Sequence, residues 1–267
     1  MSIPTGAIGV FDSGMGGLTV LKALRALLPE ESFIYLGDTA RLPYGTKSAG
    51  TVQRYARQAS AALVERDVKA LVVACNTASA FALPMLQATY PGLPVCGVVE
   101  PGAAAVAATA TEGVLVLATE GTVQEGAYSA AILRRNRHAK VWSRPCQLLV
   151  ALAEDGRVDG AMIELALTEF AAPALAGDVG QLLLGCTHFP VFKPALAGLL
   201  PASVRVVDSA ATTAQAVADL LAEKKLLGPP GAQSTVTLLA TDGVRRFTRL
   251  GAQFLGEAVS GVELINL

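Results

Sequence analysis

The sequence lacks a strong charge of either sign, a cysteine-rich segment and a long apolar run. Its 267 residues carry 21 Lys and Arg against 22 Asp and Glu, so the net charge of -1 gives no general attraction to nucleic acid or anionic lipid. We interpret the basic segment 134–140 as a solvated helix end. The four cysteines contain no CxxC pair, which excludes a disulfide framework and a zinc site. Residues 70–99 are uncharged, but prolines interrupt them, so we expect no membrane span.

The sequence does contain ample apolar material for a folded core, with 52% hydrophobic and 16% charged residues. Helix-length segments with apolar spacing near 3.6 occupy 18–28, 51–66 and 211–223. Short apolar runs lie between such segments at 8–11, 33–36, 70–74, 95–99, 113–118, 139–142, 181–184, 204–207 and 235–240. Apolar strands that alternate with helices predict an α/β fold with largely parallel sheets. The N-terminus shows no basic stretch before an apolar one, so we expect no signal peptide and a cytoplasmic protein with free thiols.

Polar residues gather where the predicted strands end. In open α/β sheets the ligand crevice lies outside the carboxyl ends of the strands, so side chains that are distant in sequence converge there. The candidates are Asp12, Ser13, Asp38, Cys75, Asn76, Thr77, Cys186, Thr187 and His188. At Asp208, Ser209, Thr241 and Asp242 we expect ordinary helix caps instead.

Two segments of the chain repeat one design. Residues 71–77 and 182–188 each contain three aliphatic residues, a small residue, a cysteine and then hydrogen-bonding side chains. Two related α/β units that face each other would place Cys75 and Cys186 on opposite walls of one cleft. We therefore predict two pseudo-symmetric domains with the site between them. The first takes residues 1–99 plus 208–267, and the second takes 100–207.

Two matched strand-end thiols suit proton transfer at one carbon. Inversion of a carbon centre needs a base on one face and an acid on the other, and thiols reach both states near neutral pH. Cys96 and Cys146 lie in apolar surroundings, and we interpret them as core residues. An alternative is nucleophilic chemistry, with Cys186 attacking and His188 as its base.

Other strand-end groups supply supporting chemistry. The glycine-rich turn 12–17 is suited to bind an anion through backbone N–H groups, and Asp12 could meet an ammonium group or control a thiol. Asn76, Thr77 and Thr187 can stabilise developing negative charge. His188 could orient the neighbouring thiol or relay a proton, and metal ligation is not expected because no second ligand stands at a suitable spacing.

Four motifs together resemble bacterial glutamate racemases of the aspartate/glutamate racemase family. They are Asp12-Ser-Gly-Met-Gly-Gly17, Gly37-Asp-Thr-Ala-Arg-Leu-Pro-Tyr-Gly45, Ala74-Cys-Asn-Thr-Ala-Ser79 and Leu184-Gly-Cys-Thr-His-Phe-Pro190, in the family's order. The resemblance implies interconversion of L- and D-glutamate without pyridoxal phosphate, metal or other cofactor, to supply D-glutamate for peptidoglycan. It also implies a homodimer.

The resemblance also assigns roles to residues. It implies that Cys75 acts on D-glutamate and Cys186 on L-glutamate, and that other groups assist the thiols: Asp12, Asp38, Glu154 and His188. It implies substrate contacts from Asp12, Ser13, Tyr44, Gly45, Asn76, Thr77, Thr187 and His188, with Thr119 and Thr122 as weaker candidates. One departure is Gln147, where the family has proline, which relaxes the start of the helix that leads to Glu154.

Alternatives to glutamate racemisation stay open. A two-thiol relative could racemise another amino acid such as aspartate, although the 37–45 motif favours glutamate. Some family members are reported to bind DNA gyrase, but the charge pattern of this chain gives no sign of such a surface. Because the chain begins shortly before its first predicted strand, we expect no N-terminal segment for binding an activator.

Overall fold

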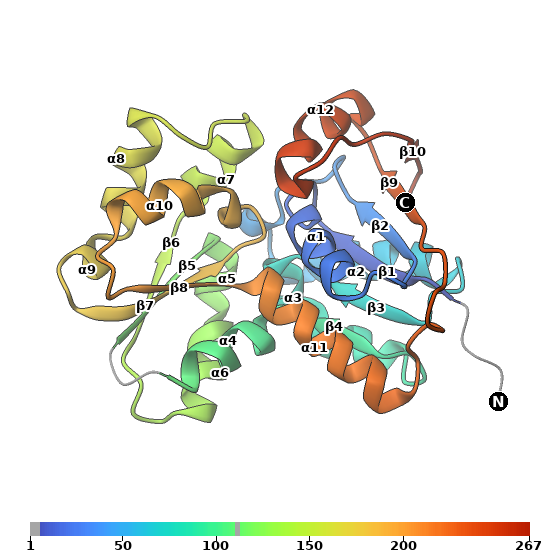
Figure 1. Cartoon of the computed structure of the whole chain (residues 1–267), viewed down its shortest axis with the longest axis horizontal. Coiled ribbons are helices and arrows are strands. Elements are labelled where there is room, and N and C mark those ends of the chain that lie inside the picture. Colours follow the sequence, from blue (N-terminus) through green and yellow to red (C-terminus); the bar gives the residue numbers. More distant parts are fainter. Residues whose placement is uncertain (1–5, 110–112) are drawn as a thin grey trace.

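The computed structural model describes residues 6–109 and 113–267, and all structural statements below refer to them. The chain forms two sheets in two halves that lie side by side (Figure 1). The first sheet has the strand order β10-β9-β2-β1-β3-β4 and the second has the order β6-β5-β7-β8, and every pairing between the described strands is parallel. The strands are β1 (Ile8–Asp12), β2 (Phe33–Gly37), β3 (Ala70–Val73), β4 (Val95–Gly97), β5 (Gly113–Ala118), β6 (Val141–Pro145), β7 (Val179–Gly185), β8 (Arg205–Asp208), β9 (Val236–Ala240) and β10 (Val262–Leu264).

Helices connect these strands, as parallel pairing requires a crossover. They are α1 (Leu18–Leu27), α2 (Ala49–Val64), α3 (Asn76–Thr89), α4 (Val99–Ala107), α5 (Glu120–Glu125), α6 (Ala127–Arg135), α7 (Gln147–Glu154), α8 (Ala161–Phe170), α9 (Ala172–Leu175), α10 (Lys193–Leu199), α11 (Ser209–Lys224) and α12 (Val244–Leu255), with 3₁₀ turns η1 (Tyr44–Thr46) and η2 (Phe189–Phe192). Among the described residues, no helix is both long enough and apolar enough to cross a membrane.

The central strands are buried on both faces. Successive side chains of a strand point to opposite faces, so Val10 packs into one apolar cluster and Phe11 into another. Leu115 of β5 and Leu182 of β7 belong to the same cluster as Val10. The core is therefore continuous from one half to the other, and burial of this shared apolar surface favours keeping the two sheets together.

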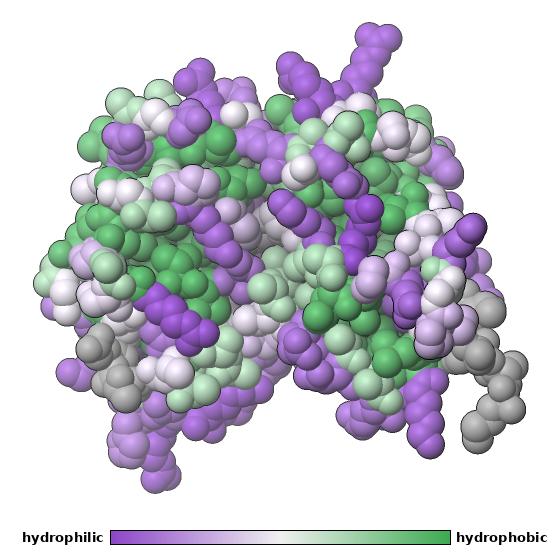
Figure 2. All heavy atoms as spheres, in the orientation of Figure 1, coloured by the Kyte–Doolittle hydropathy of each residue, from purple (hydrophilic) through white to green (hydrophobic). Residues whose placement is uncertain are grey.

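The surface is polar at the end of α6. In the space-filling view the molecule is indented at its lower edge between the two halves, and hydrophilic side chains project at the lower left, around α6 (Figure 2). Glu100 of α4 pairs there with Arg134 and, at 2.6 Å, with Arg135. The basic segment at this helix end is thus partly neutralised within the chain.

The structure confirms the predicted α/β fold class, and each predicted strand is present with a shift of a few residues at most. The short strand β10 was not predicted. The predicted domain boundaries stay a prediction; they fall at the start of α4 and at the last residue of β8. Asp208 caps α11, because its Oδ1 accepts the N–H groups of Ala210 and Ala211 at 2.9 and 3.0 Å.

The other predicted caps are wrong. Gly243 stands at the N-cap position of α12, and Ser209 lies inside α11, after its Asp208 cap. Thr241 instead donates its hydroxyl to Oδ1 of Asp38 at 2.9 Å, because this buried carboxylate offers a better partner than a helix start that lies further along the chain.

Candidate active site

A small cavity lies where the carboxyl ends of strands from both sheets face each other. Its volume is about 20 Å³, which leaves room for about one water molecule. Its lining contains Ser13, Gly14, Leu42, Pro43, Tyr44, Gly45, Cys75, Asn76, Thr77, Thr119, Val150, Glu154, Cys186, Thr187 and His188. The structure thus brings together nearly all the residues that the motifs single out, as expected for the crevice of a parallel α/β sheet.

Cys75 stands at the end of β3 and caps α3. Its Sγ accepts the N–H of Ala78 at 3.4 Å and lies 3.5 Å from Oγ of Ser13, and the residue is 4% exposed. Burial raises the pKa of the Cys75 thiol to about 12, and the negative charge of Asp12 adds to this increase, while the contacts with Ala78 and Ser13 oppose it. At neutral pH this sulfur therefore carries its proton.

Cys186 follows β7 directly and has a different electrostatic environment. Its Sγ lies 3.7 Å from Nδ1 of His188, whose Nε2 lies 2.6 Å from Oε1 of Glu154. Burial alone would lower the pKa of His188, but the contacts with Cys186 and Glu154 raise it well above its ordinary value. These contacts favour the protonated imidazole, and that ring lies beside the sulfur of Cys186.

Glu154, the last residue of α7, is the anionic partner of that imidazole. Burial alone would raise the pKa of Glu154, but the hydrogen bond and charge of His188, and then the charge of Arg246, lower it. Gln147 begins α7 in place of the family's proline, and Glu154 nevertheless reaches His188. The departure noted in the sequence therefore does not displace this carboxylate.

Asp12 stands behind the cavity wall and does not line it. Its carboxylate accepts the N–H of Gly14 at 2.9 Å and the hydroxyl of Thr187 at 3.4 Å, and the side chain is fully buried. Burial raises the pKa of Asp12, and the charge of His188 opposes that increase. The charge of Asp12 raises the pKa of Cys75, and the predicted contact of Asp12 with a substrate ammonium group stays a prediction.

A cluster of three hydroxyl groups joins the two halves. Oγ1 of Thr77 lies 2.9 Å from Oγ1 of Thr119 and 3.3 Å from that of Thr122, and the last two are 2.9 Å apart. Thr77 stands in the first turn of α3, and Thr119 caps α5. Hydroxyl groups and backbone N–H groups at two helix starts thus meet at one edge of the cavity, an arrangement suited to bind an anion.

Asn76 lines the cavity and carries a buried side-chain acceptor. Its Nδ2 donates to the hydroxyl of Tyr128 at 2.7 Å, and no described residue bonds its buried Oδ1. A buried acceptor without a partner is costly, so this oxygen is available to a donor that enters the cavity, such as an ammonium group.

The Tyr44–Gly45 turn closes one side of the cavity and is held by Asp38. The Asp38 carboxylate accepts the hydroxyl of Tyr44 and, at 2.6 Å, Nε of Arg41. Asp38 itself does not line the cavity. Its contacts with Tyr44 and Arg41 hold the turn in place. Glycine is needed at position 45, because a Cβ atom there would lie 2.6 Å from Cβ of Thr119.

Some residues in or beside the cavity wall escaped the sequence analysis. Leu42 and Pro43 lie inside the 37–45 motif, but an apolar role in the wall was not predicted. Val150 stands four residues before Glu154 on α7, and that helical spacing could have identified it. Arg246, whose Nη2 lies 3.4 Å from Oε2 of Glu154, belongs to no motif.

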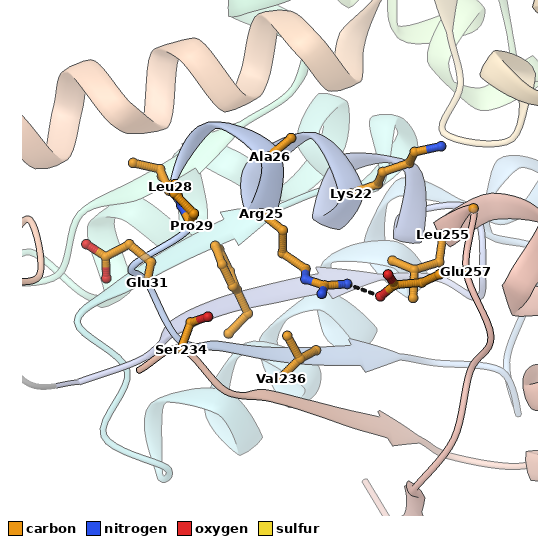
Figure 3. Close-up of a pocket in the computed structure, with 12 residues that line it drawn as sticks. Lys22, Arg25, Ala26, Leu28, Pro29, Glu31, Ser234, Val236, Leu255 and Glu257 are labelled. Carbon is orange, nitrogen blue, oxygen red and sulfur yellow. Dashed lines mark hydrogen bonds and ion pairs between the residues drawn. The ribbon is translucent and has the colours of Figure 1, made fainter. Parts of the chain in front are cut away.

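A larger cavity of about 400 Å³ lies at the opposite, amino-terminal edge of the first sheet (Figure 3). Its lining includes Phe33 and Val236, the first residues of β2 and β9. Arg25 forms an ion pair with Glu257 there. Among the described residues, no cysteine or histidine lines this cavity. Within 6–109 and 113–267, no group of three or more His, Cys, Asp or Glu side chains could hold a metal ion.

The fold and the residues around the small cavity define an α/β enzyme of the amino-acid racemase class. The sequence profile of the Asp/Glu/Hydantoin racemase family matches residues 17–217. The chain therefore belongs to this family, and it is an isomerase that racemises an amino acid.

Individual relatives agree over nearly the full length. The glutamate racemase of Geobacter metallireducens is 46% identical over 99% of this chain and 98% of its own. The structure of the Francisella tularensis glutamate racemase in complex with D-glutamate has a TM-score of 0.92 at 36% identity, covering 99% of this chain and 98% of its own. The Thermus thermophilus glutamate racemase, in complex with beta-chloro-D-alanine, has a TM-score of 0.88 at 42% identity over 100% and 99%.

Proposed function

We propose that this chain interconverts L- and D-glutamate, with Cys75 and Cys186 as the two acid/base groups. One observation carries the proposal: two buried thiols, each following a strand of a different sheet, line the same cavity. The names of the full-length relatives support glutamate as the substrate. The Escherichia coli enzyme in complex with L-glutamate, 30% identical with a TM-score of 0.80, supports it further.

The two thiols have unequal environments. Burial and the charge of Asp12 keep the proton on Cys75, whereas Cys186 lies beside His188, whose pKa is raised. In the L-to-D direction the Cys186 thiolate takes the proton from Cα, and the electron pair of the broken C–H bond passes into the α-carboxylate. The S–H bond of Cys75 then breaks, and its proton goes to the opposite face of Cα. The thiols end with exchanged states, ready for the reverse reaction.

The remaining lining groups hold the substrate. Asn76 Oδ1 accepts from the ammonium group, while the threonine hydroxyls at the starts of α3 and α5 bind a carboxylate. A cavity of about 20 Å³ is far smaller than glutamate, so the two walls separate before substrate enters. Closure then excludes water around the carbanion, which strengthens every electrostatic contact in the site.

The wider role follows the same proposal. The D-glutamate product supplies peptidoglycan synthesis in the cytoplasm, and the enzyme works as a homodimer without an added cofactor. Racemisation of aspartate and binding to DNA gyrase stay predictions, and no contact described above favours either one.

The test is racemisation in deuterated water. L-Glutamate should yield D-glutamate with deuterium at Cα, without added pyridoxal phosphate and after treatment with a chelator. Cys75→Ser and Cys186→Ser should each lower kcat/KM at least ~1000-fold, because each step uses both groups. The loss should be equal in both directions, since the two enantiomers have equal free energy.

Cys96→Ser is the matched control, because Cys96 lies outside the cavity lining. It should retain full activity. Full activity of Cys75→Ser would instead overturn the two-thiol mechanism, and faster turnover of aspartate than of glutamate would overturn the substrate assignment.

A further inference from the structure

Helix α12 of the first half presents one face to the Glu154–His188 pair of the second half. Arg246 Nη2 donates to the backbone oxygen of Glu154 at 2.7 Å and lies 3.4 Å from Oε2 of the same residue. Two turns further along α12, the ring of Phe254 meets the ring of His188 edge-on, with 5.4 Å between centroids. Positions 246 and 254 lie on the same side of a helix, so one rigid element contacts both members of the pair.

We propose that Arg246 is a positioning residue of the reaction: it holds the Glu154 carboxylate against His188 and thereby keeps a cation beside Cys186. The proposal rests on the proposed two-thiol function, since it assigns a purpose to the charge next to Cys186. Arg246 does not line the cavity and is therefore not expected to touch substrate.

The contacts of Glu154 show why it needs such a partner. Its Oε1 is used by His188, and no described residue makes a hydrogen bond to Oε2, which has the ion pair with Arg246 as its charged contact. Glu154 also ends α7, so its backbone oxygen is one of the carbonyls that a helix leaves without an internal partner. The guanidinium group satisfies the backbone oxygen and faces the carboxylate at once, which fixes the side chain relative to the helix end.

Geometry rather than charge alone gives Arg246 its effect. Its side chain is 47% exposed, so solvent screens much of its charge. A role through charge and a role through positioning predict opposite changes in the pKa of His188 when Arg246 is replaced. Removal of a nearby cation would by itself raise the pKa of His188, whereas release of the Glu154 carboxylate would lower it, because the imidazolium would lose its anionic partner.

The charged groups around the pair are few and known. Glu154 faces His188 and Arg246, and His188 faces Cys186 and Glu154. The charge of Asp12 acts on both members of the pair, and Tyr35 interacts with Glu154. The side chain that α12 packs against His188 is the apolar Phe254. A change in the titration of His188 can therefore be interpreted from this small set.

The experiment is nitrogen NMR of the full chain with ¹⁵N-labelled histidine. The sequence contains two histidines, and the exposed His138 serves as an internal reference in each spectrum. In Arg246→Gln the pKa of His188 should fall by about one unit relative to the unchanged enzyme. Arg246→Lys should give a smaller decrease, because an ammonium group keeps the charge without the planar fork. Arg245→Gln, which removes the same charge from an exposed neighbour, is the control and should change nothing.

Kinetics supply the second readout. Arg246→Gln should lower kcat about tenfold with KM unchanged, as expected for a residue outside the cavity that acts on one acid/base group. An unchanged or increased pKa of His188 in both Arg246 variants would overturn the proposal. The two proposals can fail separately. If the wild-type enzyme does not racemise glutamate, the proposed function is wrong. The titration of His188 can still be measured, because it requires no turnover.

Discussion

Oγ1 of Thr77 lies 2.9 Å from Oγ1 of Thr119, and this hydrogen bond joins the start of α3 in one half to the start of α5 in the other. Both side chains are buried, with 2% and 5% exposed. A neutral hydrogen bond contributes about 1 kcal/mol, but a buried hydroxyl group without a partner costs more than that. The same hydroxyls that close the cavity are the ones proposed to bind a carboxylate, so closure and substrate binding use shared groups.

Thr119→Val should weaken both functions of this contact. The substitution removes the cap of α5 and leaves the Thr77 hydroxyl with fewer partners, so we expect a loss of about 1–2 kcal/mol in the free energy of unfolding. KM for glutamate should rise several-fold. Thr119→Ser keeps the hydroxyl group and should behave almost like the unchanged chain. Urea denaturation and steady-state kinetics measure the two effects, and equal KM values for the Val and Ser variants would contradict the role in binding.

The sequence predicted the sheets well because their strands are apolar on both faces. Strands such as β5 and β7 are buried along their whole length, and each contains an aliphatic run, 114–117 and 182–184, that ends at small residues. Strand β10 gave no such signal. It has three residues at the edge of its sheet, with Glu263 and Leu264 exposed, so neither a run nor an alternation marks it.

The sequence predicted those site residues that belong to strand-end motifs. It did not predict residues whose place in the site depends on side-chain direction or on packing between segments distant in sequence. Cys75 and Cys186 follow from the repeated motif. Asp12 is also at a strand end, yet its carboxylate accepts the N–H of Gly14 and does not line the cavity. Arg246 stands 92 residues from Glu154 on a helix with no motif, so only the packing of α12 reveals their contact.

Asp12→Asn should lower the pKa of Cys75. After burial, the charge of Asp12 is the largest cause that raises this pKa, and asparagine removes the charge while keeping an oxygen for the N–H of Gly14. A decrease of about one unit would speed alkylation of Cys75 about tenfold at pH values below its pKa. Mass spectrometry of iodoacetamide-treated protein measures the rate. Cys96, whose pKa is raised to about 11 by burial alone, is the internal reference. An unchanged ratio of the two rates would contradict the electrostatic role of Asp12.

Cys75 should also make the folded chain less stable in alkali. Its pKa is raised to about 12 in the folded state from an ordinary value of 9.0, so above pH 9 the unfolded thiol loses its proton while the folded one keeps it. Stability is therefore lost as the pH rises from about 9 towards 12, by up to about 1.4 kcal/mol per pH unit for one group. Cys75→Ala removes this contribution. Urea denaturation from pH 8 to 11 should show a shallower decline for the variant, and parallel curves would show that the prediction is wrong.

The final prediction concerns a buried ion pair far from the thiols. Lys69 Nζ lies 2.5 Å from Oε2 of Glu31, and the two side chains are 6% and 4% exposed. Glu31 Oε1 also accepts the N–H of Gly228 at 2.7 Å, so the pair fixes the connection before β9 to the amino-terminal edge of the first sheet. Lys69→Met would leave the Glu31 charge buried without its cation. The free energy of unfolding should fall by about 3–5 kcal/mol.

Glu31→Gln combined with Lys69→Met is the matched control for that variant. It leaves no uncompensated charge, and an apolar group replaces the ammonium, so most of the lost stability should return. The pair lies at the edge of the sheet opposite the cavity, and folded Lys69→Met protein should therefore keep the kcat and KM of the unchanged chain at 25 °C. Urea denaturation of both variants decides the point. If Lys69→Met lowers the free energy of unfolding by less than about 1 kcal/mol, the prediction is wrong, and the pair is as weak as an exposed salt bridge.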